Sequence, residues 1–251
     1  MSRRSDNRSR QGRKASRLRA DKPASRPKSR RSLVRRLILA VLIVFVGFPV
    51  GLIALYSVVP PPITPLMVIR LFEGEGLDKD WVSLEAVSRH VPHAVIASED
   101  NRFCEHNGYD WEAIGEAIEE HKDGKRLRGA STISMQTTKN ILLWPGRDFV
   151  RKGLEAYLTV FVEALWTKRR IIEIYLNVAE WSSGVYGIEA AARHYFGKSA
   201  KDLSKREASL LATVLPNPRG RSAAQPTQRM TRMAATVRKR ITQLGPMLDC
   251  V

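Results

Sequence analysis

Cysteine and histidine are scarce in this sequence, and their spacing excludes the common metal-binding and disulfide-rich classes of protein. The chain has two cysteines, Cys104 and Cys250, and five histidines, with no CxxC, HxxxH or HExxH pattern. No familiar zinc-ligand spacing is therefore present. Two cysteines can pair in an oxidising compartment but form no disulfide framework, and we predict that both are free thiols packed inside the fold.

Acidic residues are almost missing from residues 1–36. This segment has 15 Lys and Arg residues against two Asp, so it carries +13 of the formal net charge of +17. Its few apolar residues cannot form a core, and we predict a disordered basic tail. A basic arm is typical of proteins that bind nucleic acid or a membrane surface, and the adjoining segment decides between the two. The rest of the chain carries only +4, which gives no sign of a nucleic-acid-binding domain.

Charge is absent altogether from residues 37–59, LILAVLIVFVGFPVGLIALYSVV. As a helix this segment would extend roughly 35 Å, enough to cross a hydrocarbon core of about 30 Å. An interior proline such as Pro49 is tolerated in membrane helices. The exit Val59-Pro60-Pro61-Pro62 is a poor signal-peptidase site, so we predict an uncleaved anchor.

The charges that flank this predicted membrane helix indicate its orientation. Arg35 and Arg36 directly precede it, whereas Arg70 and Lys79 are the only basic residues in the sequence from 60 to 82. Because basic residues stay preferentially on the cytoplasmic side, we predict a cytoplasmic N-terminus and an exported domain that follows the helix.

Beyond residue 59 the apolar residues recur at helical spacing, and no convincing alternation predicts a strand. We predict a connector over residues 60–80, Pro-rich and then Gly-containing, followed by one mainly α domain over 81–251. Asp110 is expected to cap a helix that buries Trp111, Ile114 and Ile118. Other helices are expected over 81–99, 149–166 and 168–179, with a polar loop at 121–132.

Two further helices are predicted near the C-terminus. Ser204 and Glu207 form a capping-box pattern before an apolar run, which Pro216 and Pro218 end. The last helix is indicated by an amphipathic stripe of Met230, Met233, Val237, Ile241 and Leu244.

Four polar segments are candidates for chemistry, although each has an ordinary structural explanation when it is taken alone. Residues 99–108 (EDNRFCEHNG) place acids and a His at a helix end, where they are either solvated charges or a general base in a cleft. Residues 129–140 (GASTISMQTTKN) suit a phosphate or a sugar, or simply begin a helix. Residues 147–163 contain either a structural ion pair or a cationic pocket with a carboxylate at its edge. Residues 168–177 (KRRIIEIYLN) join a basic entrance to an apolar face.

The order and spacing of these segments closely resemble the glycosyltransferase family 51 domain. The resemblance covers about residues 85–225 and includes later stretches at 186–198 and 207–218. Met135 departs from it, because the family usually has two adjacent glutamines there, which puts one hydrogen bond to substrate in doubt. The matching positions, in motif order, are Glu99, Asp100, Phe103, His106 and Gly108; Gly129, Ser131, Thr132, Gln136, Lys139 and Asn140; Arg151, Lys152 and Glu155; and Lys168, Ile171, Glu173, Tyr175, Leu176 and Asn177.

The resemblance implies a lysozyme-like α-helical fold and an enzyme that polymerises lipid II into peptidoglycan glycan strands with inversion at the anomeric carbon. Lipid II is an undecaprenyl-diphosphate-linked disaccharide-pentapeptide, and undecaprenyl diphosphate would be released. Glu99 is the implied general base, and Glu155 is the second catalytic carboxylate, which positions the donor or holds a divalent ion. No prosthetic group is required, and the resemblance allows Mg²⁺ or Mn²⁺ at the diphosphate.

The same resemblance assigns the remaining site residues. Ser131 and Gln136 would hydrogen-bond the substrate, while Asp100 and His106 shape the site. Phe103, Thr132 and Asn140 complete the predicted substrate-binding set. The cations that would neutralise the diphosphate are Lys139, Arg147, Arg151 and Lys152.

The expected partners are lipid II, the growing glycan strand and membrane lipid, at the cell inner membrane with the catalytic domain in the periplasm. Other cell-wall synthesis or division proteins are allowed as partners, and nucleic acid is not expected. The exported part contains no SxxK and no KTG, so a monofunctional enzyme is expected rather than a penicillin-binding protein.

Three other functions stay open on the sequence alone. A hydrolase on a similar fold would need the acid but not the cations between Lys139 and Lys152. An inactive membrane-anchored scaffold is suggested only by Met135, and a nucleic-acid-binding protein only by the basic tail.

Overall fold

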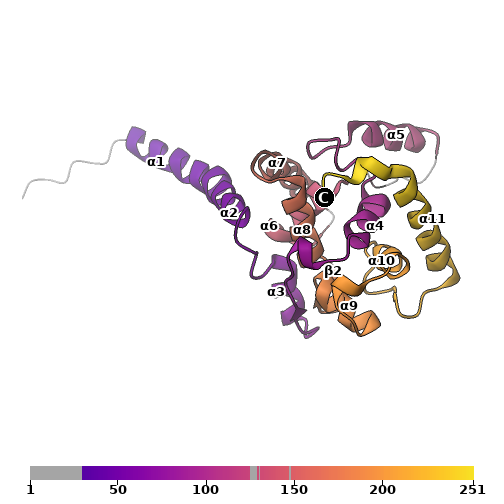
Figure 1. Cartoon of the computed structure of the whole chain (residues 1–251). Coiled ribbons are helices and arrows are strands. Elements are labelled where there is room, and N and C mark those ends of the chain that lie inside the picture. The colour runs from indigo at the N-terminus through magenta and orange to yellow at the C-terminus, as the bar shows by residue number, and fades with distance from the viewer. Residues whose placement is uncertain (1–29, 125–128, 130, 147) are drawn as a thin grey trace, which may run out of the picture. The chain divides into compact units, whose positions relative to one another are not determined.

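The computed structural model describes residues 30–124, 129, 131–146 and 148–251 (Figure 1). The described residues are mostly helical, which confirms the predicted mainly α class. Residues up to Val41 form one unit, and Leu42–Val251 form the other. The α-helices are α1 (Arg30–Leu42), α2 (Phe48–Tyr56), α3 (Pro65–Phe72), α4 (His90–Glu99), α5 (Trp111–Lys122), α6 (Ile133–Leu142), α7 (Phe149–Leu165), α8 (Lys168–Val178), α9 (Ile188–Phe196), α10 (Lys205–Ala212) and α11 (Gln228–Leu244). Short elements are the π-helix η1 (Ile43–Gly47), the 3₁₀-helices η2 (Leu84–Ala86), η3 (Ala200–Asp202) and η4 (Gly245–Leu248), and the strands β1 (Asp78–Lys79), β2 (Glu180–Ser182) and β3 (Val185–Tyr186).

A continuous helical run over Ser32–Tyr56 is long and apolar enough to cross a membrane. It begins before the predicted residue 37 and ends before residue 59. Pro49 is the second residue of α2, directly after the π-helix η1 and inside the continuous run, so it cannot donate to a carbonyl of the preceding turn. The predicted tail over 1–36 lies outside the described residues except at its end.

The C-terminal end of this run is bonded to the domain. Trp166 donates its indole N–H to the carbonyl of Ile53 at 2.8 Å. Arg170 donates from Nε and Nη2 to the carbonyl of Tyr56 at 3.0 and 2.9 Å. Tyr56 is the last residue of α2, so Arg170 caps a carbonyl that has no partner within the helix, whereas the Ile53 carbonyl accepts from both Trp166 and the Ser57 N–H.

The segment expected as a connector, residues 60–80, is built into the domain instead. Thr64 accepts a hydrogen bond from the Met67 N–H and so caps α3, and the Met67 side chain is fully buried. Lys79 donates to the carbonyls of Pro61 and Pro62 at 2.7 and 2.8 Å. Helix α3 occupies only eight residues, too few for its periodicity to stand out in the sequence.

A three-stranded sheet of order β1-β3-β2 joins this segment to the middle of the chain. Strand β1 pairs parallel to β3, with Asp78 opposite Val185, and β2 pairs antiparallel to β3. The strands have two or three residues each, so no alternation could reveal them. Gly184 has φ +70°, and a Cβ there would lie 2.1 Å from the Glu75 carbonyl oxygen, so this close approach requires glycine.

Most helix boundaries follow the local signals. Helices α7 and α8 match the predicted ranges to within one residue. The Ser204 capping box opens α10, as predicted. The predicted helix over 81–99 is wrong in its first half, because Pro92 is accepted only near a helix start, and α4 begins at His90.

Helix α5 corrects another prediction. Asp110 does cap it, accepting from the Ala113 N–H at 2.9 Å. However, Trp111 is 71% exposed and Ile118 is 49% exposed, and only Ala117 is buried. Figure 1 shows α5 at the edge of the domain. Helical spacing tells which residues share a face, and it does not tell whether another element covers that face.

Two central helices position the site. Helix α4 packs against α10 and α11, and α6 packs against α7 and α8. The core between them includes the fully buried Trp181, Tyr186 and Phe103. The C-terminus of α4 and the N-terminus of α6 thereby meet at the motif around Glu99.

Candidate active site

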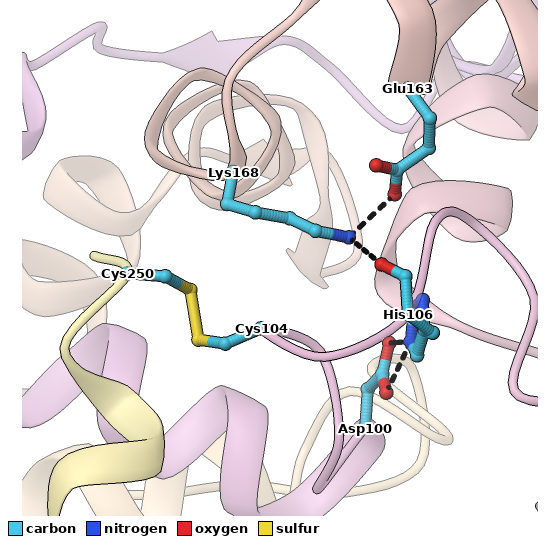
Figure 2. The surroundings of a disulfide bond; sticks show 6 residues. All are labelled: Asp100, Cys104, His106, Glu163, Lys168 and Cys250. Carbon is cyan, nitrogen blue, oxygen red and sulfur yellow. Dashed lines mark hydrogen bonds and ion pairs between the residues drawn. A yellow bond between two sulfur atoms is a disulfide. The ribbon is translucent and has the colours of Figure 1, made fainter.

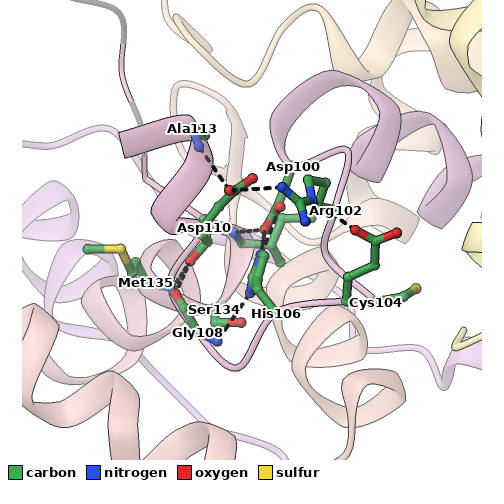
Figure 3. A network of polar contacts seen from close by, with 12 residues as sticks. Asp100, Arg102, Cys104, His106, Gly108, Asp110, Ala113, Ser134 and Met135 are labelled. Carbon is green, nitrogen blue, oxygen red and sulfur yellow. Dashed lines mark hydrogen bonds and ion pairs between the residues drawn. The ribbon is translucent and has the colours of Figure 1, made fainter. Parts of the chain in front are cut away.

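Asp100 joins the turn after α4 to the start of α6. Its carboxylate contacts His106 Nε2 at 2.9 Å and accepts the Ile133 N–H at 2.9 Å (Figure 3). Ile133 is the first residue of α6, where unpaired N–H groups and the helix dipole favour a negative charge. His106 Nδ1 accepts the Gly108 N–H at 3.1 Å. Asp100 and His106 therefore hold the turn that follows Glu99, and any contact of theirs with substrate stays a prediction.

Phe103, predicted to bind substrate, lies too deep to do so, and Thr132 makes mainly structural contacts at the edge of the cavity that Glu99 lines. Phe103 has no exposed surface, and Lys168 places its Nζ 4.6 Å from the ring centroid. Thr132 is 2% exposed; its hydroxyl donates to the Gly108 carbonyl at 2.6 Å and accepts from Met135 N–H. The prediction for Phe103 is corrected to a structural role, because motif spacing marks a required residue without showing whether it touches a ligand, whereas substrate binding by Thr132 stays a prediction.

Lys168 fixes the far side of the same turn. Its Nζ donates to the His106 carbonyl at 2.6 Å and to Glu163 at 2.8 Å (Figure 2). The sequence places Lys168 in a motif but assigns it no role. Its position five residues after Glu163 could not reveal that both turn inward beside residue 106.

The cysteines are not the free thiols predicted from the sequence. Cys104 and Cys250 form a disulfide, with Cα atoms 5.7 Å apart, as Figure 2 shows. Their separation of 146 residues hides this proximity in the sequence. The final segment, from α11 through η4, returns to the turn that follows Asp100, and it thereby brings Cys250 within bonding distance.

Glu99 lies at the inner wall of a cavity of about 250 Å³. Gln136 Nε2 donates to its carboxylate at 3.2 Å, and the Tyr175 hydroxyl donates to Gln136 Oε1 at 3.2 Å. The tyrosine thus orients the amide so that its N–H faces Glu99. Burial raises the pKa of Glu99, and the hydrogen bond from Gln136 only partly opposes that shift. Such a carboxyl is suited to accept a proton near neutral pH.

A cationic cluster surrounds Glu155 on α7. Arg151 Nη1 and Lys152 Nζ each lie 2.6 Å from a different oxygen of Glu155, whose side chain is 3% exposed. Lys152 also donates to the Ser131 hydroxyl at 2.8 Å. Arg151 Nε is buried without a hydrogen-bond partner among the described residues. The structural ion pair, one of the two expected alternatives, is present, and the cationic pocket stays a prediction.

Lys139 lies near both Glu99 and this cluster. It follows Gln136 by one turn of α6, and the charges of both Glu99 and Glu155 act on it. Burial lowers the pKa of Lys139, as desolvation does for a cation. Asn140 lines a small cavity beside Lys139, and Arg147 lies outside the described residues.

The described residues do not form a set of protein ligands that would bind a metal ion at Glu155. They contain no group of three or more His, Cys, Asp or Glu side chains that could hold a metal ion. Both oxygens of Glu155 are already engaged by Arg151 and Lys152. The chemistry of this cluster is therefore derived below from its cationic side chains, and a divalent ion at the diphosphate stays a prediction.

Comparison with known proteins decides the family. A family model described as transglycosylase matches residues 67–242, which is more than half of the chain. The chain belongs to the transglycosylase family. The predicted resemblance is confirmed, and the transglycosylase domain begins inside α3, in the segment expected as a connector.

Several relatives match this transglycosylase along most of its length. A protein of Rhodospirillum centenum is 52% identical over 214 residues, which cover 84% of this chain and 93% of the relative. One of Caulobacter vibrioides is 46% identical over 228 residues, covering 88% and 97%. One of Pseudomonas fluorescens SBW25 is 52% identical over 200 residues, covering 77% and 83%. Each is named a biosynthetic peptidoglycan transglycosylase.

Replacing Asp100 with Ala is expected to lower both stability and activity. The change leaves the buried Ile133 N–H unpaired, which costs about 1–3 kcal/mol, and it frees the turn that carries Glu99. Glu189→Ala is a matched control, because this buried carboxylate accepts the Ala200 N–H at 2.7 Å outside the catalytic cavity. Thermal unfolding and transferase rate would be measured for both variants at a temperature where each is folded. Equal rates would show that Asp100 does not position the site.

Proposed function

We propose that this transglycosylase polymerises lipid II into peptidoglycan glycan strands, with inversion at the anomeric carbon and release of undecaprenyl diphosphate. One observation carries the proposal. A buried carboxyl, Glu99, accepts from Gln136 on α6, and the same helix carries Lys139 near a cationic cluster at Arg151 and Lys152. A base and an anion-binding group are the two elements that this transfer requires.

Glu99 is the general base of the proposed reaction. The 4-hydroxyl oxygen of the acceptor sugar attacks the anomeric carbon of the donor, and its proton passes to the Glu99 carboxylate. The bond from the anomeric carbon to the diphosphate oxygen breaks, and the electron pair leaves with the diphosphate. Attack from the face opposite the leaving group inverts the configuration. The raised pKa of Glu99 makes its carboxylate a stronger base than an ordinary exposed glutamate.

The cations stabilise the departing diphosphate. Lys152 is 42% exposed and already contacts Ser131, so it can reach a ligand beside α6. Arg151 has a buried Nε without a partner among the described residues, and guanidinium groups suit bidentate contact with phosphate oxygens. Glu155 acts through these two cations by fixing their positions, because its own oxygens are engaged. A hydrolase would have no need of such a cluster.

The proposed location is the inner membrane, crossed once, with the N-terminus in the cytoplasm and the catalytic domain in the periplasm. The helical run at Ser32–Tyr56 and the two arginines before residue 37 support this topology. The Cys104–Cys250 disulfide supports it independently, because disulfides persist in oxidising compartments such as the periplasm. A lipid-linked substrate would then lie in the membrane that holds the enzyme.

The full-length protein in detergent or nanodiscs, given labelled lipid II, is expected to make long glycan that lysozyme degrades. Omission of the lipid-linked donor should abolish the product. Soluble fragments released from preformed glycan would indicate a hydrolase instead. No reaction from folded protein in either medium would overturn the proposal in favour of a scaffold.

A further inference from the structure

Arg240 of α11 lies in the wall of the cavity that Glu99 lines. Its neighbours on the same face of the helix, Val237 and Ile241, are buried where α11 packs against α4. Arg240 Nη1 donates to the Ala97 carbonyl, in the last turn of α4, at 3.3 Å. A guanidinium has several N–H donors in one plane, so this bond leaves others for a ligand in the cavity.

Arg240 is the cation of this cavity that is open to a ligand. The other one, Arg102, pairs with Glu112 and lies 3.9 Å from Asp110. Among the described residues, Arg240 forms no ion pair, and its guanidinium is bound only to a neutral carbonyl. Glu116 lines the cavity from an exposed position on α5, where water screens its charge. An anionic group is therefore the ligand that Arg240 suits.

Asn101 adds a hydrogen-bond acceptor to the same cavity. Its Oδ1 atom is buried and has no hydrogen-bond partner among the described residues. A buried polar atom without a partner is unfavourable, so an N–H group of a ligand would stabilise it. A ligand that matches both Asn101 and Arg240 carries an amide N–H and a carboxylate. A peptide has both groups.

We propose that Arg240 and Asn101 bind the peptide of the acceptor lipid II, with a peptide carboxylate at Arg240, an inference that rests on the proposed function. Glu99 takes the proton of the acceptor hydroxyl, so the cavity beside Glu99 holds the acceptor rather than the donor. The sugars of the acceptor have no charge for an arginine to bind. Its pentapeptide supplies amide N–H groups and a C-terminal carboxylate. Arg240 thus recognises the acceptor and takes no part in proton transfer.

The diphosphate of the acceptor is the other anion to consider. Figure 1 shows α2 and α11 on opposite sides of the unit Leu42–Val251. Helix α2 packs against α7, whereas α11 packs against α4 and α10. In the proposed topology, a lipid-linked diphosphate stays at the membrane, on the side of α2. The peptide extends from the sugar and can point away from the membrane, so its carboxylate is the anion assigned to Arg240.

Arg240→Ala in the full-length protein tests this assignment. A labelled donor whose own 4-hydroxyl is blocked cannot act as acceptor, so its transfer can be followed while acceptor lipid II is varied. The variant is expected to raise KM for the acceptor about 10–100-fold with little change in kcat, as for the loss of a hydrogen bond to a charged group. Arg232→Ala removes the same charge at an exposed position of α11 outside the cavity and should match wild type.

An acceptor whose peptide carboxylates are converted to amides separates recognition from a structural role. Wild type should have a KM for this acceptor close to that of Arg240→Ala for the normal one, and the variant should lose nothing further. A loss in Arg240→Ala of the same size for both acceptors would overturn the inference, because Arg240 would then only support α4. Unchanged acceptor KM with normal polymerisation would also overturn it and leave the proposed function standing.

Binding without turnover gives a second readout. The lipid-free disaccharide-pentapeptide, titrated into wild type and followed by NMR, should bind more tightly than its amidated form. Arg240→Ala and Asn101→Ala should each weaken binding of the unmodified form. Failure of wild type to distinguish the two forms would overturn the inference. Carboxylate-dependent binding by a protein that makes no glycan would support the peptide site and overturn the proposed function alone.

Discussion

Glu99→Gln is expected to lower glycan synthesis by about 10²–10⁴-fold, the usual cost of losing a general base. Glutamine keeps the size of the side chain and can still contact Gln136, so the cavity should keep its shape. Glu119→Gln is the matched control, because it removes the same charge at an exposed position of α5 outside the cavity. Initial rates with labelled lipid II would be compared for the three proteins. Retained activity in Glu99→Gln would exclude Glu99 as the base.

The same substitution is expected to stabilise the fold at neutral pH. Burial raises the pKa of Glu99 in the folded protein above its value in the unfolded chain. The contribution of Glu99 to the free energy of unfolding is therefore most favourable below the pKa of the unfolded chain. That contribution is lost as pH rises through the folded pKa, where the carboxylate becomes a buried charge. Glu99→Gln should therefore unfold at a higher temperature than wild type at pH 8, by roughly 2–4 °C for each kcal/mol gained. The difference should shrink toward pH 4, and a difference independent of pH would contradict this explanation.

Glu99 also predicts the acid side of the activity profile. The carboxyl must lose its proton before it can accept one from the acceptor sugar. Because the pKa of Glu99 is raised, the wild-type kcat is expected to decrease on acidification at a higher pH than it would if the base were an ordinary exposed glutamate. Rates measured between pH 4 and pH 8 on the folded protein would show the pH at which activity is lost on acidification.

Replacing Cys104 and Cys250 together with Ser is expected to cost about 2–5 kcal/mol of stability, the typical loss for a native disulfide. The bond closes a long loop, and its loss gives the unfolded chain more freedom. For a domain of this size the unfolding temperature should fall by about 2–4 °C for each kcal/mol. Activity should fall as well, because Cys104 lies in the turn between Glu99 and His106.

Reduction of the wild-type protein is the natural comparison for this double variant. A thiol reductant should lower the unfolding temperature of wild type to that of the variant and leave the variant unchanged. Thiol labelling would confirm that the bond has opened. An unchanged unfolding temperature after complete reduction would show that the disulfide does not stabilise the domain.

Local signals predicted the helices that depend on local chemistry. The Asp110 cap, the Ser204 capping box and the stripe on α11 each involve residues a few positions apart. The disulfide and the β1–β3 pairing join residues more than 100 positions apart, and no periodicity records such contacts. The exposure of Trp111 was missed for the same reason, since burial depends on distant elements.

The active site shows the same difference between what motifs predict and what only the folded chain reveals. Motif matching identified Glu99, Gln136 and Lys152, and the structure places them around α6. It could not separate residues that face the cavity from those beneath it, so Phe103 was assigned to substrate although it is fully buried. The orienting hydrogen bond from Tyr175 to Gln136 needed two helices in contact before it could be recognised.

The hydrogen bonds at the end of α2 bear on the distance between the active site and the membrane. Trp166 and Arg170 hold the carbonyls of Ile53 and Tyr56 directly, so the C-terminal end of α2 is fixed to the domain. In the proposed topology, the level at which glycan is extended above the bilayer is then fixed by the protein and does not vary with the length of a linker. New strands would then leave every copy of the enzyme at the same depth of the periplasm.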